Sequence, residues 1–498
     1  MFFEYNQAIV STYSEVIPDY SFLHPIQGKY VTSVRIFKHY IRLPFIILGL
    51  LEFILIAASV YGAAYTYSMV MVGTHNVNEI IGFVLPRAII VAVVLMFSMI
   101  ALGLYQTRLR EGALGYFLRL TASFFLGTLV LALIFYAFPS LFLGRGALLL
   151  TEVYAFVSIS VVRNILYFAG PSVFKKRILV LGAGERAHSI TELRRKSDMV
   201  GFIIIGYLHI RGEQDTVSPE KVIHQNAPLP EFCALNDIDE IVLAVNDRRK
   251  GFPMPELLDC KMSGVDVVDV LTFFERETSK IKLDHLHPSY FLYSDGFKQG
   301  IARIYSKRLF DILASSLLLF LTWPLMALTT FAIMITEGFN KPILYRQVRV
   351  GEDGRPFQVL KFRSMRIDAE KDGKAQWAQK NDSRVTPVGG FIRKVRIDEL
   401  PQIFNVFRGD MSFVGPRPER PEFVGELSDK IPYYSERHRI RPGITGWAQL
   451  LYPYGATEKD ALEKLQYDLY YVKNHTFFLD FLILLQTVEV ILFGKGAR

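Results

Sequence analysis

Residues 307–335 read KRLFDILASSLLLFLTWPLMALTTFAIMI, an apolar run that is long enough to cross a bilayer. Pro324 lies in its middle, and an internal proline kinks or breaks a helix because it lacks a backbone donor. The run begins in a basic segment, and a strongly basic polar region follows it. A simple crossing would place these regions on opposite sides of the membrane, although basic segments prefer the cytoplasm. The sequence therefore favours a re-entrant helix, broken at Pro324, over a spanning one.

Four earlier stretches are apolar over about 20 residues, the length of a membrane-spanning helix. They cover 43–65, 84–105, 121–143 and 147–169. Lysine and arginine are concentrated before the first, between the second and third, and after the fourth, and such basic loops stay in the cytoplasm. We therefore expect residues 1–170 to form a four-helix transmembrane bundle with both ends cytoplasmic. Its expected role is anchoring. Substrate passage is the alternative, but no intramembrane carboxylate relay favours it.

The composition restricts the function classes. Hydrophobic residues make up 51% and charged residues 21% of the chain, which fits a multidomain membrane protein with soluble regions. The net charge of +8 suits an acidic membrane surface or phosphorylated substrates. Nucleic acid is not expected as a partner, because the basic residues are spread among apolar segments. Cys233 and Cys260 are the only cysteines, so neither a disulfide framework nor a cysteine metal site is expected.

Residues 171–300 have the pattern of a Rossmann-like α/β domain. A strand-like run over 177–181 leads into Gly182, Gly184 and Ala187, a spacing that allows a tight turn beside a phosphate. Further strand-like runs, separated by helical stretches, cover 202–208, 238–245 and 265–270. This alternation predicts a parallel, doubly wound sheet.

Two features indicate that this domain is a degenerate, non-catalytic module. The second strand ends near His209, where a dinucleotide-binding domain usually places an acidic residue for the ribose. In addition, no tyrosine in this domain is followed four residues later by the lysine that short-chain oxidoreductases need. Nucleotide binding at the glycine loop is the alternative. In that case the chain would be a membrane-tethered nucleotide-sugar oxidoreductase or epimerase.

The region after the apolar run is polar and basic. Two strand-like runs, joined by a turn signal, cover 343–350 and 357–362. The second run leads into Lys361 and Arg363, which form either a solvated edge strand or a phosphate-facing row. Further on, Thr386 and Pro387 predict a helix start, because a capping residue precedes proline at the first helical position.

Asp398 and Glu399 follow this predicted helix. The apolar residues after them recur with helical spacing. Asp398 is therefore either the N-cap of a second helix or one of two carboxylates that share a divalent cation. Arg396 precedes the pair, and Arg417 and Arg441 follow it. Prolines on both sides fix the backbone of Arg417, which suits a rigid, bidentate phosphate ligand.

Four motifs in this order resemble those of the bacterial sugar transferases, the monotopic polyprenyl-phosphate phosphoglycosyl transferases. They are KFRSM at 361–365, DELPQ at 398–402, GPRP at 415–418 and RPGITGW at 441–447. The resemblance covers the chain from about residue 303 onward by motif and the first 300 residues by architecture. The complete arrangement is similar to the large subgroup that initiates exopolysaccharide or O-antigen repeat units.

The resemblance implies a chemistry for these residues. Asp398 would be the nucleophile that attacks the sugar-bearing phosphorus of a UDP-sugar, releases UMP and forms an aspartyl phosphosugar. Polyprenyl phosphate would then attack, giving polyprenyl-diphosphosugar. Asp398 and Glu399 would hold Mg²⁺ (or Mn²⁺), and Pro324 would mark the break in the re-entrant helix. The implied phosphate-binding residues are Lys361, Arg363, Arg396, Arg417, Pro418 and Arg441.

The resemblance also implies a setting. Residues 301–498 would form an α+β monotopic catalytic domain on the cytoplasmic face of the bacterial inner membrane. The donor would be a UDP-sugar and the acceptor undecaprenyl phosphate in the lipid bilayer. Downstream glycosyltransferases and the polymer export machinery would follow, and the Rossmann-like module offers a surface for a homodimer. No residue identifies the sugar.

Two expectations concern the whole protein and its tail. The remaining alternative to an enzyme is a non-catalytic scaffold for export partners, in which Asp398→Asn would leave function intact. The tail, residues 477–493, is apolar with two acidic positions. It is predicted to be an amphipathic interfacial helix.

Overall fold

A computed structural model describes most of the chain. The described residues are 33–73, 83–106, 113–169, 175–193, 196–199, 201–224, 227–246, 251–286, 288–294, 296–297, 300–367, 384–452, 455 and 457–492. All of them belong to one unit, which spans Thr32–Arg498. Parts of the loops used to predict membrane orientation lie outside the described residues.

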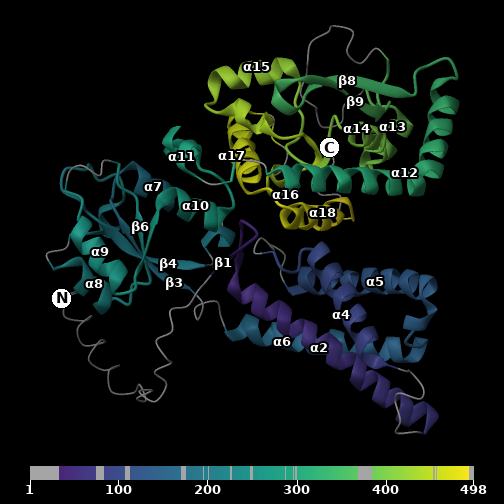
Figure 1. Ribbon diagram of the computed structural model, residues 1–498, viewed down its shortest axis with the longest axis horizontal. Coiled ribbons are helices and arrows are strands. Elements are labelled where there is room, and N and C mark those ends of the chain that lie inside the picture. Colours follow the sequence, from purple (N-terminus) through teal and green to yellow (C-terminus); the bar gives the residue numbers. More distant parts are fainter. Residues whose placement is uncertain are drawn as a thin grey trace, which may run out of the picture. The chain divides into compact units, whose positions relative to one another are not determined.

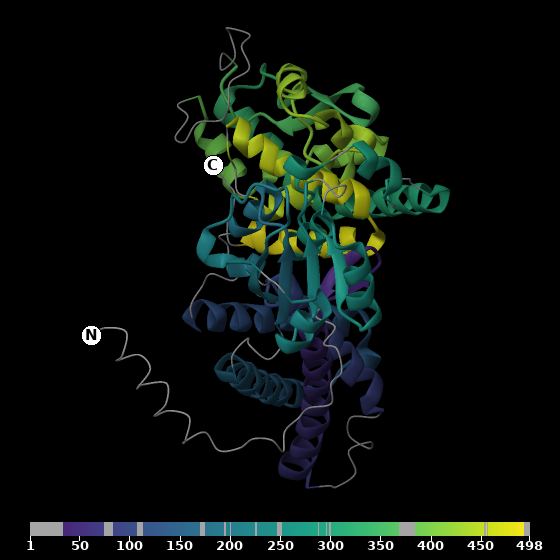
Figure 2. The ribbon, with the colours of Figure 1, turned by 90° about the vertical axis from the view of Figure 1, so that its left-hand side faces the viewer.

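Four apolar helices near the N-terminus pack on one another (Figures 1 and 2, purple to blue). They are α2 (Leu43–Tyr67), α4 (Val84–Ala101), α5 (Ala113–Ala137) and α6 (Arg145–Ala169). Helix α2 contacts α4 and α6, and α4 contacts α5. Their shared core includes Ile56, Leu95 and Leu131, whereas large apolar side chains such as Phe125 and Leu133 are exposed on the outside. Each helix is long and apolar enough to cross a membrane. An apolar exterior of this kind is typical of a protein that faces lipid.

Two charged residues inside these helices pair with each other. Glu52 of α2 is fully buried and forms an ion pair with Arg163 of α6, whose Nη2 lies 2.8 Å from the Glu52 carboxylate. The Tyr105 hydroxyl donates to the same carboxylate. Because an unpaired charge is costly inside a membrane, this pairing explains how the apolar helices tolerate the two residues.

The α/β region contains the predicted parallel sheet. Its strands are β3 (Lys176–Leu181), β4 (Phe202–Leu208), β5 (Val222–Ile223), β6 (Glu240–Leu243) and β7 (Asp266–Asp269). They are arranged in the order β5-β4-β3-β6-β7, and every pairing is parallel. Four helices cover the sheet, namely α7 (Glu185–Thr191), α8 (Leu229–Leu235), α9 (Met254–Met262) and α10 (Val270–Thr278).

Alternation along β3 divides the helices between the two faces of the sheet. Ile178 and Val180 share a core with residues of α7 and α10. Leu179 and Leu181 share the opposite core with residues of α8 and α9. All four side chains are fully buried, as expected when helices cover both faces of a parallel sheet. The expectation of a doubly wound α/β region is confirmed.

The C-terminal region, residues 301–492, combines helices with short strands. Its helices are α12 (Ile301–Glu337), α13 (Pro387–Lys394), α14 (Gln402–Arg408), α15 (Pro421–Lys430), α16 (Trp447–Leu451), α17 (Glu458–Asn474) and α18 (Phe477–Leu492). Strands β8 (Leu344–Val350) and β9 (Pro356–Phe362) form an antiparallel hairpin. Strands β10 (Ser412–Val414) and β11 (Gly443–Thr445) pair in parallel. The described residues also form the hairpin β1 (Ser33–Ile36)–β2 (His39–Arg42) and helix α11 (Pro288–Tyr293).

Helix α12 changes direction along its length (Figure 1). Near its start, Arg308 donates to the carbonyl oxygen of Phe407 in α14 at 2.7 Å. Farther along the helix, Ile333 belongs to a small hydrophobic core. Leu400, which lies just before α14, packs against the same core. A straight helix would separate residues 308 and 333 by roughly 37 Å at 1.5 Å per residue, so both contacts require a bend. Pro324 lies inside the helix and accounts for a kink, although the helix continues through it.

The tail helix α18 turns both of its acidic side chains into the protein. Asp480 is buried and forms ion pairs with Arg303 and Lys307 at the start of α12, the latter at 2.9 Å. Glu489 is also buried and pairs with Arg119 of α5 at 2.7 Å. Helix α18 therefore links the C-terminal region to the apolar helices.

Candidate functional site

Glu399 lies at the centre of a group of cations. Its Oε1 accepts from Lys361 Nζ at 3.0 Å and from Arg417 Nη2 at 3.2 Å. Its Oε2 lies 3.7 Å from Arg396 Nη1. Burial alone raises the pKa of Glu399, but Lys361, Arg417 and Arg396 outweigh it and hold that pKa well below its usual range. Glu399 is thus a fixed anion on which three predicted phosphate-binding side chains converge.

Asp398 is buried beside this cluster. Its carboxylate differs from that of Glu399 both in its hydrogen bonding and in its pKa. Among the described residues, Lys361, Arg417 and Arg396 contact Glu399, and no hydrogen bond to the Asp398 carboxylate is found. Burial raises the pKa of Asp398, with a further contribution from the Glu399 charge, while Lys361 lowers it. An unbonded carboxylate in a desolvated site keeps its lone pairs available for a reacting atom, which is the state that a nucleophile needs.

The structure answers the question of whether Asp398 is a helix cap. Asp398 lies in a separate tight turn, Ile397–Glu399, and α14 begins only at Gln402, after Pro401. No side chain caps that helix. The interpretation of Asp398 as an N-cap is therefore wrong, because Asp398 does not cap α14.

The turn that holds Asp398 is strained and firmly supported. Arg396 adopts φ of +61°, in the left-handed region that non-glycine residues rarely occupy. Such strain persists only where the surrounding structure imposes it, and it is common at functional sites. The preceding helix begins as predicted, because Thr386 accepts a hydrogen bond from Gly389 N at 3.0 Å. The packing of Gly389 is tight, since a Cβ on it would lie 1.9 Å from Ser364 O.

Arg417 is positioned by tightly packed backbone. A Cβ on Gly415 would lie 2.3 Å from Arg441 O, and one on Gly446 would lie 2.2 Å from Gly415 O. Glycine at both positions is therefore what lets β10 and β11 approach at the base of the GPRP segment. In addition, the buried Arg437 donates to Arg417 O at 3.0 Å. These contacts fix the backbone from which the Arg417 side chain reaches Glu399.

The other predicted phosphate-binding residues lie differently. Arg363 is buried, with its Nη2 3.5 Å from Glu337, and its Nε and Nη1 have no hydrogen-bond partner among the described residues. Arg441 pairs instead with Glu352, in the turn between β8 and β9, at 3.2 Å. Pro418 is buried and contributes its carbonyl oxygen, which accepts from Arg349 Nη1 at 3.1 Å. None of these three has a recorded contact with Glu399.

Two supporting features were not found by sequence reasoning. Asn405 of α14 is fully buried; it accepts from Leu360 N at 3.0 Å and donates to Gln358 O at 2.7 Å. It thereby attaches β9, and with it Lys361, to the helix that follows Asp398. The second feature is the buried ion pair of Arg437 and Asp468, at 2.7 Å. Neither partner stands in a motif that would have marked it.

The glycine loop of the α/β region is filled by the protein's own carboxylate. A Cβ on Gly184 would lie 2.7 Å from Glu213 Oε1, which also accepts from Asn246 N at 3.1 Å. Glu213 therefore lies where a dinucleotide-binding loop would receive a pyrophosphate. Ala187 is buried in the core behind the loop. A carboxylate at this position repels a second anion, which argues against the oxidoreductase alternative.

Several proteins of known activity are similar to this chain. The family described as "Bacterial sugar transferase" matches residues 302–494. A UDP-glucose:undecaprenyl-phosphate glucose-1-phosphate transferase of Klebsiella pneumoniae is 36% identical over 332 residues, 65% of this chain and 69% of that protein. An undecaprenyl-phosphate galactose phosphotransferase of Salmonella typhimurium is 29% identical over 65% of this chain and 70% of its own length.

A third relative has a narrower overlap. The UDP-N-acetylgalactosamine-undecaprenyl-phosphate N-acetylgalactosaminephosphotransferase of Aeromonas hydrophila is 43% identical over 242 residues. That match covers 49% of this chain, and the chain spans only 56% of the length of that relative. The three relatives are named for three different sugars.

The apolar helices and the parallel sheet define a membrane-associated protein with an α/β region. Its C-terminal region carries an acidic pair surrounded by cations, inside the segment that the family match covers. The chain belongs to the bacterial sugar transferase family.

Proposed function

We propose that this protein transfers a sugar 1-phosphate from a UDP-sugar to undecaprenyl phosphate, giving polyprenyl-diphosphosugar and UMP. The observation that carries the proposal is the contrast within the acidic pair. Asp398 is buried without a recorded hydrogen bond, whereas Glu399 holds Lys361, Arg396 and Arg417. This arrangement supplies a nucleophile next to groups that neutralise phosphate charge.

The reaction proceeds in two displacements at one phosphorus. First, an Asp398 oxygen attacks the sugar-bearing phosphorus, and the bond to the bridging oxygen breaks, so that UMP leaves with the electron pair. Then an oxygen of undecaprenyl phosphate attacks the same phosphorus, and the aspartyl–phosphorus bond breaks to restore the Asp398 carboxylate. Lys361, Arg396 and Arg417 stabilise the negative charge on the transferring phosphoryl group.

A divalent cation fits the acidic pair only with help from the substrate. The described residues contain no group of three side chains that could hold a metal ion. Mg²⁺ typically uses one or two protein carboxylates together with substrate phosphate oxygens. Asp398 and Glu399 would hold Mg²⁺ (or Mn²⁺) in this way. The ion would supply charge neutralisation at the donor diphosphate.

The membrane setting belongs to the same proposal. Helix α12 enters the cytoplasmic face of the inner membrane, bends near Pro324 and returns, as a re-entrant helix. The four apolar helices span the membrane as a bundle with both chain termini in the cytoplasm. The bend is supported by the contacts that both halves of α12 make around α14. An active site at the interface lets a water-soluble donor and a lipid acceptor meet without extraction of the lipid.

Release of UMP tests the reaction. The purified protein would be incubated with Mg²⁺, undecaprenyl phosphate and a panel of UDP-sugars that includes glucose, galactose and N-acetylgalactosamine. We expect UMP with at least one of them. A failure to release UMP with every sugar, by protein shown to be folded, would contradict the proposed reaction.

Covalent labelling tests the role of Asp398. With donor radiolabelled in the sugar and no acceptor present, wild type should retain label after denaturation. Asp398→Ala should retain none, while Asp429→Asn, a change at an exposed position on α15, should label like wild type. Label that persists on Asp398→Ala would show that a different residue is the nucleophile. A protein that releases no UMP, and whose cellular function is intact in Asp398→Asn, would favour the scaffold hypothesis.

A further inference from the structure

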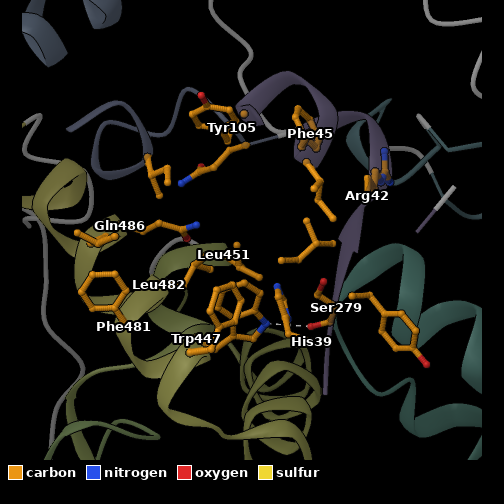
Figure 3. Close-up of a pocket in the computed structure, with 18 of the residues that line it drawn as sticks. His39, Arg42, Phe45, Tyr105, Ser279, Trp447, Leu451, Phe481, Leu482 and Gln486 are labelled. Carbon is orange, nitrogen blue, oxygen red and sulfur yellow. Dashed lines mark hydrogen bonds between the residues drawn. The ribbon is translucent and has the colours of Figure 1, made fainter. Parts of the chain in front are cut away.

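A large apolar cavity lies away from the acidic pair. Its volume is about 570 Å³. The lining comes mainly from strand β2, the start of α2, the end of α4, helices α16 and α18, and the end of α10. In Figure 3, Trp447, Leu451 and Leu482 lie on one side of it, with Phe45 and Tyr105 on the other. None of the residues predicted to bind phosphate lines it.

The cavity is continuous with the surface that faces lipid. Leu50 of α2 and Phe97 of α4 both line it, and their side chains are 61% and 42% exposed. Both belong to helices that are long and apolar enough to cross a membrane. At this rim, the exposed leucine and phenylalanine side chains contact the hydrocarbon of the bilayer and not water.

The polar groups at the other end of the cavity are already matched to one another. Arg42 pairs with Glu277 at 3.4 Å, and Arg276 pairs with both Glu277 and Glu240 at 2.7 Å. The cations that border the cavity are therefore balanced by carboxylates. This end offers no excess positive charge to recognise a phosphate, so the site selects for a hydrocarbon chain.

We propose that this cavity binds one acyl chain of a bilayer phospholipid. An apolar void of this size does not hold ordered water well, because water needs several polar partners. Its volume falls within the range of about 300–1,000 Å³ that is usual for small-molecule sites. The charge balance at its inner end argues for a chain whose headgroup stays at the membrane surface, rather than for the acceptor lipid with its terminal phosphate.

The bound chain would rest on Trp447. This side chain donates from Nε1 to Ser279 O at 3.0 Å and stacks on Tyr470 with ring centroids 6.1 Å apart. The preceding residue, Gly446, closely approaches Gly415, two positions before Arg417. The phospholipid thus fills the space between the apolar helices and the segment that positions Arg417. This inference does not depend on the proposed transferase reaction.

Fluorescence of Trp447 provides the test. The chain has three tryptophans, so Trp323→Phe and Trp377→Phe leave Trp447 as the single reporter in the full-length protein. This protein is reconstituted into vesicles of phosphatidylglycerol and phosphatidylethanolamine, with or without bromine on the acyl chains. Bromine quenches tryptophan on contact. Because Trp447 is buried away from the outer surface of the spans, we expect a loss of fluorescence only if an acyl chain enters the cavity.

A matched pair of α2 variants provides the control. Gly49 lines the cavity, and a Cβ on it would make ordinary contacts with Met96 at 3.5 Å and Tyr105 at 3.8 Å. Gly49→Leu should therefore narrow the cavity and reduce the quenching of Trp447. Gly62→Leu, on the same helix but outside the lining, should leave the quenching unchanged. Both substitutions replace glycine with a better helix former, so neither should unfold α2.

Three outcomes would overturn the proposal. The first is the absence of quenching by brominated phospholipid in the reporter protein. The second is equal quenching in Gly49→Leu and in the parent protein, because the chain would then reach Trp447 by another route. The third is relief of quenching by undecaprenyl phosphate at a small fraction of the phospholipid concentration, which would identify the acceptor lipid as the occupant.

Discussion

Lys361 donates a hydrogen bond to Glu399 Oε1 at 3.0 Å, and so a residue of β9 is fixed to the acid next to the proposed nucleophile. The same cation lowers the pKa of Asp398 without a recorded hydrogen bond to it. Lys361 is therefore placed to do two things at once. It holds Glu399 as an anion and makes Asp398 easier to ionise.

The pH dependence of covalent labelling should report the ionisation of Asp398. Burial raises the pKa of Asp398, so the acid limb should lie above about 3.9, the usual value of an aspartate. Labelling should rise with pH as Asp398 loses its proton, while Glu399 stays ionised throughout. The acceptor must be omitted from this measurement, because a phosphate monoester itself titrates near pH 6.

Lys361→Met should move that acid limb to higher pH. Burial and the Glu399 charge raise the pKa of Asp398, whereas Lys361 lowers it. The substitution removes the Lys361 cation, so the pKa of Asp398 should rise. The labelling rate should also fall roughly 10²–10³-fold, as when one charge-stabilising donor is removed from an active site. Rates of label incorporation across pH 4–8 check both effects. An acid limb that stays in place would show that another group controls it.

Adjacent glycines in α13 should respond oppositely to alanine. A Cβ at Gly389 would lie 1.9 Å from the backbone oxygen of Ser364, so Gly389→Ala must displace the KFRSM segment or the helix. We expect a loss of about 1–3 kcal/mol of stability, the usual cost of overpacking, together with lower UMP release. At Gly390 the nearest atom would be Val385 Cγ1 at 3.9 Å. Gly390→Ala should be neutral or stabilising by up to about 1 kcal/mol.

Thermal unfolding of the two glycine variants in the same detergent makes the comparison. Both changes add one methyl group to the same helix, so general effects on helix propensity are shared. Equal unfolding temperatures for Gly389→Ala and Gly390→Ala would contradict the close approach of α13 to Ser364.

The elements that could be predicted from the sequence are those fixed by local patterns. The helix start at Thr386 was predictable because a cap involves only neighbouring residues, and the structure shows its hydrogen bond to Gly389 N. The strands that became β8 and β9 were expected within one residue of their observed ends. The parallel sheet followed from the alternation of strand-like and helical stretches, which is also a local property.

The parts that depend on distant contacts were less accessible. Asp398 fitted a helix cap equally well, and only the observed start of α14 at Gln402 excludes that role. Arg441 stands in a motif like Arg417, yet its partner, Glu352, is 89 positions away in the chain. Glu213 fills the glycine loop from a segment that shares no motif with it. Such pairings are made by tertiary packing, which a single sequence does not display.

Loss of one partner of the buried Arg437–Asp468 pair should destabilise the protein. Arg437→Met would leave Asp468, which is 1% exposed, without its cation, at a cost of about 3–5 kcal/mol. Burial raises the pKa of Asp468 to about 6, so its ionised form is disfavoured in the folded state. The destabilisation should therefore be small near pH 4, where Asp468 is protonated, and grow as the pH rises past 6.

The double variant separates stability from positioning. Arg437→Met with Asp468→Leu removes both charges, so the unfolding temperature should recover most of the loss at pH 8. UMP release should not recover, because the hydrogen bond from Arg437 to Arg417 O is absent in both variants. Full recovery of activity in the double variant would show that Arg437 serves stability alone.

The bend in α12 leads to a prediction about membrane topology. If α12 is re-entrant, residues on both sides of it face the cytoplasm. Ser306→Cys and Asn340→Cys, both at exposed positions, would be introduced singly after replacement of Cys233 and Cys260 by serine. A membrane-impermeant maleimide should label neither in intact cells and both after permeabilisation. Ser140→Cys, between the third and fourth apolar helices, should be labelled from outside and serves as the control.

Pro324 should determine which arrangement α12 adopts. Pro324→Leu restores a backbone donor and removes the steric cause of the kink, so a straighter helix becomes accessible. A straighter α12 cannot keep Arg308 on Phe407 and Ile333 in the core beside Leu400 at once. We therefore expect lower UMP release, and labelling of Asn340→Cys from outside in a fraction of molecules. Labelling of that cysteine in intact cells without the Pro324 change would instead show that α12 spans the membrane.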